Sequence, residues 1–140
     1  MKDCAFCAIA RGETPANVVL EDERVFGFLD RAPLIKGHVL VAPRAHVADL
    51  DELPTELIAP VFAAVQRVSR VFPKVFGSDG SYTGINTRVS QSVPHFHVHV
   101  VPRREGDGLF RAGMVWMRKR YAEGEAAQLA ARLKEAIAAS

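Results

Sequence analysis

Three of the five histidines, His95, His97 and His99, stand at alternate positions of one short segment. Neighbouring side chains of an extended strand point to opposite faces, so this spacing predicts a row of three imidazoles, with Phe96 and Val98 pointing into a core. Imidazole titrates near neutral pH, and such a row can supply a nucleophile, proton donors or metal ligands. Two other interpretations remain open: a strand face whose histidines only form hydrogen bonds, and a metal site made of all three.

The two cysteines, Cys4 and Cys7, form one C-x-x-C motif. On a helix they share a face. In a reducing compartment this spacing suggests metal binding or redox exchange before a structural disulfide. No thioredoxin-like βαβ pattern surrounds the motif, and two unligated thiols are a further alternative.

The helices expected around these residues begin with residues 3–11, where Asp3 is a candidate N-cap and Gly12 a candidate stop. A longer amphipathic pattern runs from about Thr55 to Phe72, with Pro60 as a kink or a sign of a late start. Leu129, Ala130, Leu133 and Ile137 have the spacing of a closing helix.

Strand signals alternate with these helices. Val18–Glu21 and Val25–Asp30 read as a hairpin around the turn Asp22-Glu23. Three more strands are expected, at Gly37–Pro43, Tyr82–Asn86 and His95–Arg103. Consecutive strands with short turns and one long helix predict an α+β domain, with an antiparallel sheet of about five strands and short flanking helices.

Length and composition limit the number of domains and the classes of partner. The 140 residues are 49% hydrophobic and 24% charged, which predicts one globular domain over residues 1–140, with an irregular loop and helix from about residue 104. A formal charge of +2 does not suggest a general nucleic-acid or membrane binder. No apolar run reaches a membrane span and the start lacks a signal-peptide pattern, so a cytoplasmic protein is expected.

The segment His-Phe-His-Val-His-Val-Val, residues 95–101, resembles the H-φ-H-φ-H-φ-φ signature of the histidine triad nucleotide hydrolases and transferases, where φ is apolar. The preceding Gln91-Ser92-Val93 and the strand at residues 37–43 fit the same family. The similarity extends over roughly residues 3–103. It implies the histidine triad fold and a homodimer.

The resemblance also implies catalytic roles. His97, the middle histidine, would attack the α-phosphorus and become nucleotidylated before water or another acceptor releases the nucleotide. His99 would contact the phosphate. Ser92, with nearby backbone N–H groups, would stabilise its negative charge or assist the leaving group.

For the nucleotide, the resemblance implies a base pocket and a ribose contact. Asp30 would accept hydrogen bonds from the ribose hydroxyls, although alone it reads equally as a strand-end cap. Phe6, Ile9 and Phe28 would line the base pocket, and ordinary core packing is the alternative for Ile9. The further nucleotide-binding candidates are Asn86, Gln91 and Val93.

Two positions depart from the family pattern. Seven residues before Gln91 the family usually has a side-chain amide that reaches the phosphates or the leaving group, and here the residue is Gly84. Asn86 is two residues out of register. Ser90 replaces the usual glycine. These departures bear on the leaving-group preference.

The cysteine motif resembles the metal half-site of a subset of the family. There, two cysteines join a distant histidine and the first histidine of the triad. The corresponding ligands here would be Cys4, Cys7, His46 and His95. Two thiolates and two imidazoles complete a tetrahedral zinc site without an open position, so the zinc would be structural.

The resulting expectation is a nucleotide hydrolase acting on a purine nucleoside 5′-phosphoramidate or a dinucleoside polyphosphate. The alternatives are a nucleotidyltransferase or phosphorylase of the same family, and a non-catalytic nucleotide-binding or zinc-organised module. In the region of residues 106–121, Leu109, Phe110 and Trp116 could form a partner surface or a substrate cleft, or pack on their own domain.

Overall fold

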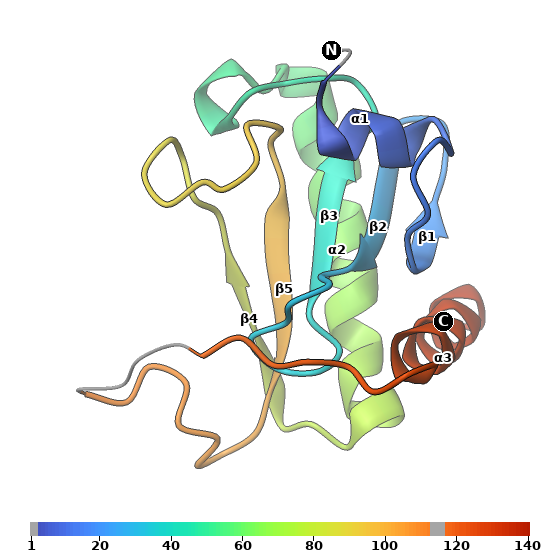
Figure 1. Ribbon diagram of the computed structural model, residues 1–140, viewed down its shortest axis with the longest axis vertical. Helices are drawn as coiled ribbons and strands as arrows, with labels where there is room; N and C mark the ends of the chain where they lie inside the picture. Colours follow the sequence, from blue (N-terminus) through green and yellow to red (C-terminus); the bar gives the residue numbers. More distant parts are fainter. Residues whose placement is uncertain (1–2, 113–116) are drawn as a thin grey trace.

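The computed structural model describes residues 3–112 and 117–140 (Figure 1). In these ranges a five-stranded antiparallel sheet has the order β1-β2-β3-β5-β4. The strands are β1 Val18–Glu21, β2 Val25–Leu29, β3 Val39–Pro43, β4 Gly80–Gly84 and β5 Val98–Arg103. The helices are α1 Ala5–Ala10, the 3-10 turn η1 Leu50–Glu52, α2 Thr55–Phe76 and α3 Glu125–Ala138. The predicted α+β class is confirmed.

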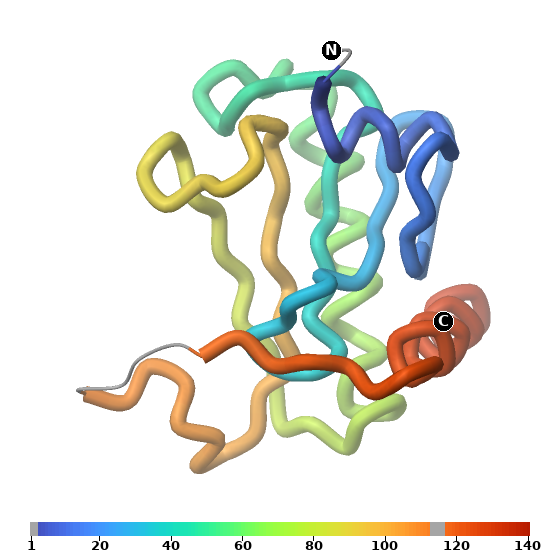
Figure 2. Tube along the Cα trace, viewed as in Figure 1, coloured from blue at the N-terminus to red at the C-terminus, as the bar shows by residue number. Residues whose placement is uncertain are grey.

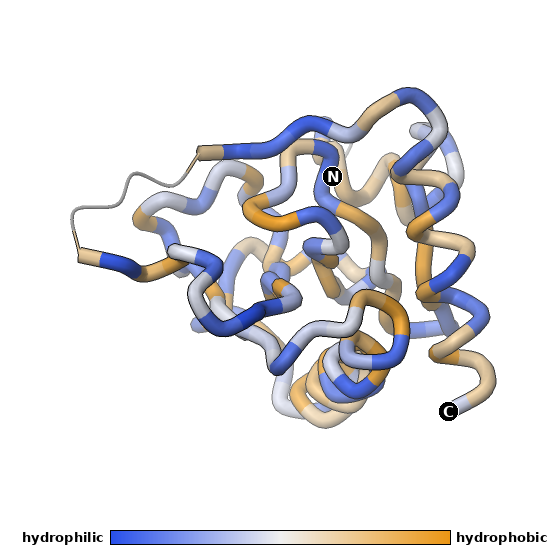
Figure 3. The backbone as a smooth tube through the Cα atoms, turned by 90° about the horizontal axis from the view of Figure 1, so that it is seen from below, coloured by the Kyte–Doolittle hydropathy of each residue, from blue (hydrophilic) through white to orange (hydrophobic). Residues whose placement is uncertain are grey.

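The main core lies between one face of the sheet and the long helix α2. Because strand residues alternate, Val39 and Val41 of β3 and Val98 and Val100 of β5 all point to this face, and all four are fully buried. The helix α2 continues four residues past the predicted end and runs through both Pro60 and Pro73. The apolar positions of α3 complete this core, and the alternation of hydrophilic and hydrophobic residues along α3 is visible in Figure 3.

The other face of the sheet carries a smaller apolar cluster covered by α1. It consists of Phe6, Phe26, Phe28, Leu40 and Ala42. All five positions of β2 are buried, since Phe26 and Phe28 face this cluster while Val25 and Leu29 face the main core. The remaining position is a glycine because the side chain of Leu20 on β1 occupies the space a Cβ would need.

Several element boundaries differ from the predictions. β5 begins at Val98, because the N–H of Phe96 bonds to the oxygen of Val47 and β3 pairs with β5 only from Val98 on. β4 ends at Gly84, two residues early. The N-cap of α1 is Cys4, whose sulfur accepts from the N–H of Cys7, and not Asp3.

The first hairpin also differs, since three residues separate β1 from β2. The carboxylate of Asp22 accepts from the backbone N–H groups of Arg24 and Val25, at 2.8 and 2.9 Å. A side chain that bonds two backbone donors closes this turn without the two-residue geometry that the sequence suggested.

Residues 117–124 cross the end of the sheet before α3 begins (Figures 1 and 2). The N–H of Lys119 bonds to the oxygen of Pro33, and the hydroxyl of Tyr121 accepts from the N–H of Gly37. Leu109 is buried, and Phe110, although 50% exposed, has its ring centroid 4.8 Å from that of Tyr82, so both pack on their own chain. Trp116 lies outside the described residues.

None of the helices within residues 3–112 and 117–140 combines the length and the apolar character needed to cross a membrane.

Candidate active site and metal centre

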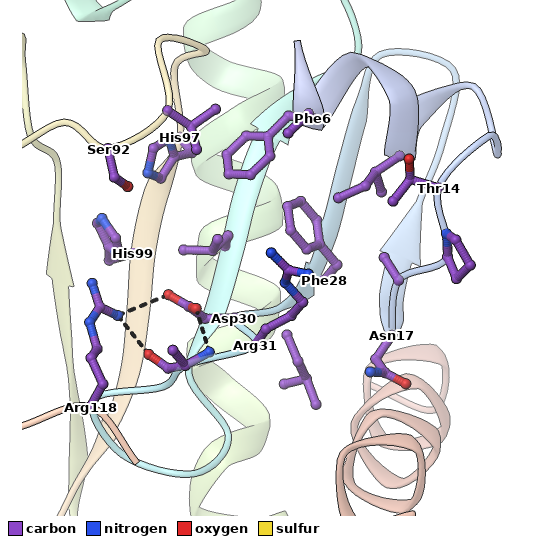
Figure 4. Close-up of a pocket in the computed structure, with 18 residues that line it drawn as sticks. Phe6, Thr14, Asn17, Phe28, Asp30, Arg31, Ser92, His97, His99 and Arg118 are labelled. Atoms are coloured by element: carbon purple, nitrogen blue, oxygen red, sulfur yellow. Dashed lines mark hydrogen bonds and ion pairs between the residues drawn. The ribbon is translucent and has the colours of Figure 1, made fainter. Parts of the chain in front are cut away.

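A pocket of about 400 Å³ opens beside α1, between the end of β2 and the start of β5 (Figure 4). This volume lies within the range of small-molecule sites. Eight of the predicted site residues line it: Phe6, Ile9, Phe28, Asp30, Ser92, Val93, His97 and His99. Asn86 and Gln91 are not among the lining residues. The segment Thr14–Asn17, which the sequence analysis did not single out, forms another part of the wall.

One end of the pocket is aromatic. The rings of Phe6 and Phe28 meet edge to face with centroids 5.1 Å apart, and the ring of Phe6 also lies 5.0 Å from the ring of His97. A flat base could rest against these apolar surfaces. Phe6 therefore connects the apolar end of the pocket to the middle histidine.

The hydrogen bond of His97 fixes its tautomer. Its Nδ1 lies 2.7 Å from the backbone oxygen of His95, and since a carbonyl can only accept, Nδ1 carries the proton. Nε2 then holds a lone pair. Burial lowers the pKa of His97, which favours the neutral ring. A neutral imidazole with a basic nitrogen in a pocket is a competent nucleophile.

A second chain of hydrogen bonds orients His99. The N–H of Leu34 donates to Nδ1 of His38 at 3.1 Å, so His38 carries its proton on Nε2. That proton is donated to Nδ1 of His99 at 2.9 Å, and His99 must carry its own proton on Nε2. This Nε2–H is buried and has no partner among the described residues. It can donate to an oxygen atom in the pocket.

Both rings in this chain are held neutral. Burial lowers the pKa of His38 to about 2, and burial followed by the charges of His97 and Arg118 lowers the pKa of His99 to about 4. Asp30, His38 and His99 have ligand atoms close enough together for a cation. Nε2 of His38 carries the proton donated to His99, however, and so has no lone pair for a metal. The arrangement therefore favours a hydrogen-bond chain over a cation site.

Asp30 closes the pocket near this chain. Its Oδ1 accepts from the N–H of Ala32 at 2.9 Å, and its Oδ2 accepts from Nη1 of Arg118 at 3.0 Å. Oδ2 also lies 3.8 Å from Nε2 of His38. Neither Arg118 nor His38 was assigned to the site from sequence. Arg118 is 88 residues from Asp30, and no local pattern connects them.

Ser92 reaches the pocket on a loop that Gln91 holds in place. The amide of Gln91 accepts from the N–H of Arg88 at 2.8 Å and donates to the oxygen of Ala48 at 2.7 Å. The side chain of Arg88 in turn bonds Asp49 at 3.0 Å. The amide of Gln91 is thus engaged in holding the loop.

The two departures from the family pattern have structural correlates. Ser90 has a φ of 61°, in the left-handed region that favours glycine, which explains why a glycine suits this position. At Gly84 a Cβ would collide with the phenol of Tyr82. The tyrosine ring therefore lies where a side chain from position 84 would begin, and position 84 pairs with His99 across the sheet.

The four predicted metal ligands lie together near the start of α1, where Cys4 is the N-cap. Their ligand atoms are all within 4.8 Å of one another. Nδ1 of His95 lies 3.3 Å from the sulfur of Cys4 and 3.5 Å from that of Cys7, and Nδ1 of His46 lies 3.4 Å from the sulfur of Cys7. Tetrahedral zinc, with bonds of about 2.3 Å to sulfur and about 2.0 Å to nitrogen, separates neighbouring sulfur and nitrogen atoms by about 3.5 Å.

His95 is also oriented for this role. Its Nε2 donates to the oxygen of Pro43 at 2.8 Å, which leaves the lone pair of Nδ1 facing the two sulfurs. An imidazole that donates its second N–H to a carbonyl is the usual arrangement of a metal-bound histidine. The residues therefore fit a zinc ion.

The comparisons with known proteins place the chain in one family. The family model of the HIT domain matches residues 11–106. An uncharacterized HIT-like protein of Methanocaldococcus jannaschii is 45% identical over 75% of this chain and 82% of its own length. The adenylylsulfatase HINT3 of Arabidopsis thaliana is 34% identical over 91% of this chain and 66% of its own length.

Among solved structures, the zinc-bound histidine triad family protein of Mycobacterium smegmatis superposes with a TM-score of 0.84. It is 35% identical in sequence, and the match covers 99% of this chain and 95% of that one.

Proposed function

The chain belongs to the histidine triad (HIT) family, and from this premise we propose that it is a nucleotide hydrolase. Its substrates would be purine nucleoside 5′-phosphoramidates or dinucleoside polyphosphates, cleaved at the α-phosphorus. The observation that carries the proposal is a pair of tautomers. Nε2 of His97 holds a lone pair in the pocket, and the Nε2–H of His99 has no acceptor among residues 3–112 and 117–140.

In the first step Nε2 of His97 attacks the α-phosphorus in line with the leaving group. A phosphorus–nitrogen bond to the histidine forms, and the bond to the leaving oxygen or nitrogen breaks with its electron pair going to the leaving group. The imidazole gains positive charge as it attacks. The oxygen of His95, which accepts the Nδ1–H, stabilises that charge.

In the second step water attacks the phosphorus of the nucleotidyl-histidine and releases one proton to solvent, which balances the proton that the leaving group takes up from solvent in the first step. The phosphorus–nitrogen bond breaks, the electron pair returns to His97, and the nucleoside monophosphate leaves. The Nε2–H of His99 donates to the phosphate oxygens through both steps, together with Ser92. These donors are aimed before substrate arrives, because His38 and the loop of Gln91 fix their positions.

Substrate recognition is proposed for the remaining lining residues. The base would rest between Phe6, Ile9 and Phe28, and Asp30 would accept from the ribose hydroxyls. Val93 would contact the nucleotide from the loop side. The relative named adenylylsulfatase supports adenylyl compounds as one substrate class.

We also propose one structural zinc ion per chain, held by Cys4, Cys7, His46 and His95. A bound zinc would supply a cross-link without an open coordination position. The cross-linked residues join the helix that carries Phe6 to the segment that carries His97. The zinc-bound relative supports this assignment.

A homodimer in the cytoplasm completes the proposal. β4 lies at one edge of the sheet, and Ile58 and Phe62 on α2 are 45% and 40% exposed. These residues are one helical turn apart and form an apolar surface on α2 that a second copy could cover.

The test is to incubate the purified protein with a panel of adenylated and guanylated compounds and to identify every product by phosphorus NMR. The panel is run with and without inorganic phosphate, and with His97→Ala as the matched control. Nucleoside monophosphate formed only by the wild type supports the hydrolase. Nucleoside diphosphate formed in the presence of phosphate would favour a phosphorylase. Binding without any turnover would favour the non-catalytic module.

A further inference from the structure

The guanidinium of Arg118 is held at the edge of the pocket with part of its hydrogen-bonding capacity unused. Nη1 donates to Oδ2 of Asp30 at 3.0 Å and to the oxygen of Ala32 at 2.8 Å. A guanidinium has five N–H donors, and these two bonds account for both hydrogens of Nη1. The hydrogens on Nε and Nη2 meet no acceptor in the part of the chain that the structure describes.

This guanidinium also lies close to the phosphate-binding end of the pocket. Its partner oxygen on Asp30 is 3.8 Å from Nε2 of His38, and this nitrogen is 2.9 Å from Nδ1 of His99. Figure 4 shows Arg118 extending into the site beside Asp30 and below His99. The positive charge of Arg118 contributes to the lowered pKa of His99, after burial and the charge of His97.

The one N–H on Nε and the two on Nη2 of Arg118 exceed what a nucleoside monophosphate needs. Under the proposed function, His97, His99 and Ser92 already contact the α-phosphate. Asp30 accepts one bond from Ala32 and one from Arg118, and a carboxylate has about four lone-pair sites. Ribose hydroxyls can therefore bind Asp30 without displacing the arginine.

We propose that Arg118 binds a second anionic group of the nucleotide, and so selects substrates that carry a phosphate, or a comparably charged group, besides the α-phosphate. This inference rests on the proposed function. The second group has two possible sources, the leaving group and a phosphate on the ribose. Either would meet a planar guanidinium suited to paired contacts with phosphate oxygens.

The test is isothermal titration calorimetry with three ligands that carry no cleavable phosphoanhydride bond: AMP, adenosine 5′-(α,β-methylene)diphosphate and adenosine 3′,5′-bisphosphate, with the guanosine counterparts in parallel. We expect the wild type to bind one of the two doubly phosphorylated ligands at least tenfold more tightly than AMP. The ligand that gains identifies the source of the second group. Arg118→Met should abolish the gain, so that the variant binds all three ligands with similar affinity.

Arg118→Lys should retain part of the gain, because a point charge replaces the planar fork. Arg120→Met is the matched control, since Arg120 is exposed in the same segment and does not line the pocket. Equal affinity of the wild type for all three ligands would overturn the proposal. So would a parallel loss of AMP affinity in Arg118→Met, which would assign the arginine to holding Asp30. A wild type that binds no nucleotide would refute the proposed function itself.

Discussion

Nδ1 of His97 donates to the backbone oxygen of His95 across 2.7 Å, so the residue proposed to bind zinc also sets the tautomer of the residue proposed to attack phosphorus. The ring of His95 is fixed at both nitrogens, by Pro43 and by the two sulfurs. The fixed ring of His95 also helps to orient the backbone carbonyl of His95, which accepts from the proton-bearing Nδ1 of His97.

The covalent role of His97 gives the first prediction. His97→Ala should stay folded and bind nucleotide while turnover falls by more than about 100-fold, because nothing replaces the nucleophile. Rapid quench of the wild type with an α-phosphorus-labelled substrate should place acid-labile, base-stable label on a peptide containing His97. Label on a different residue, or substantial turnover by the variant, would contradict the mechanism.

Zinc content is the second prediction. Elemental analysis of protein purified without added metal should give one zinc per chain, and Cys7→Ser should reduce that content. Chelation should lower the melting temperature, since metal binding free energy contributes to folding. The assignment fails if the protein lacks zinc, both thiols titrate freely and chelation leaves the melting temperature unchanged.

The third prediction concerns Asp30. Asp30→Ala should weaken ribonucleotide binding by about 1–3 kcal/mol, because ribose hydroxyls lose their acceptor. A deoxyribose analogue should bind the wild type more weakly than the ribonucleotide and should lose little further in the variant. Unchanged nucleotide affinity in the folded variant would leave Asp30 with only its structural bonds to Ala32 and Arg118.

Dimerisation is the fourth prediction. Phe62→Glu introduces a charge into the exposed apolar surface of α2 and should shift the protein from dimer to monomer in sedimentation experiments. Gln128→Glu is the matched control, because it adds the same charge at an exposed position of a different helix, α3. A wild type that sediments as a monomer would contradict the proposal.

The fifth prediction is a pH dependence of stability. The pKa of His99 is about 4 in the folded protein and about 6.5 when unfolded, so the unfolded chain binds an extra proton between these values. The free energy of unfolding should therefore fall as the pH drops from about 6.5 towards 4, by up to about 1.4 kcal/mol per pH unit for this residue.

The control for this dependence is His99→Asn, measured over the same pH range by urea denaturation. The variant retains the metal ligands, so acid release of a metal affects both proteins. Its stability should decline less steeply with falling pH than that of the wild type. Equal slopes would show that His99 does not contribute.

Much of the fold could be predicted because its signals are local. Alternation placed Phe26, Phe28 and Asp30 on one side, and in the structure the two rings share a cluster with Asp30 at the pocket just beyond the strand. The start of β5 could not be read from alternation, since His95 lies in a bend and the pairing of β5 with β3 begins only at Val98.

The parts of the site that were missed depend on tertiary proximity. His38 follows a glycine at the start of an apolar strand, and a histidine there signals a buried hydrogen-bonded role, but only the fold places it against His99. Arg118 comes from a segment whose path across the end of the sheet has no local signal. The amide of Gln91 was expected to contact the nucleotide. In the structure it bonds the backbone of Arg88 and of Ala48, and the contact with Ala48 could be seen only from the fold.

A side chain at position 84 needs space that the phenol of Tyr82 occupies, whereas position 82 can change alone. A single substitution at position 84 would force the phenol of Tyr82 out of its place against Phe110, so restoring the family's amide there requires a smaller residue at position 82 as well. Mutational paths between this chain and relatives with the amide therefore pass through a disfavoured single variant unless position 82 changes first. Comparisons of related sequences, and attempts to engineer the leaving-group preference, should treat the two positions as one epistatic unit.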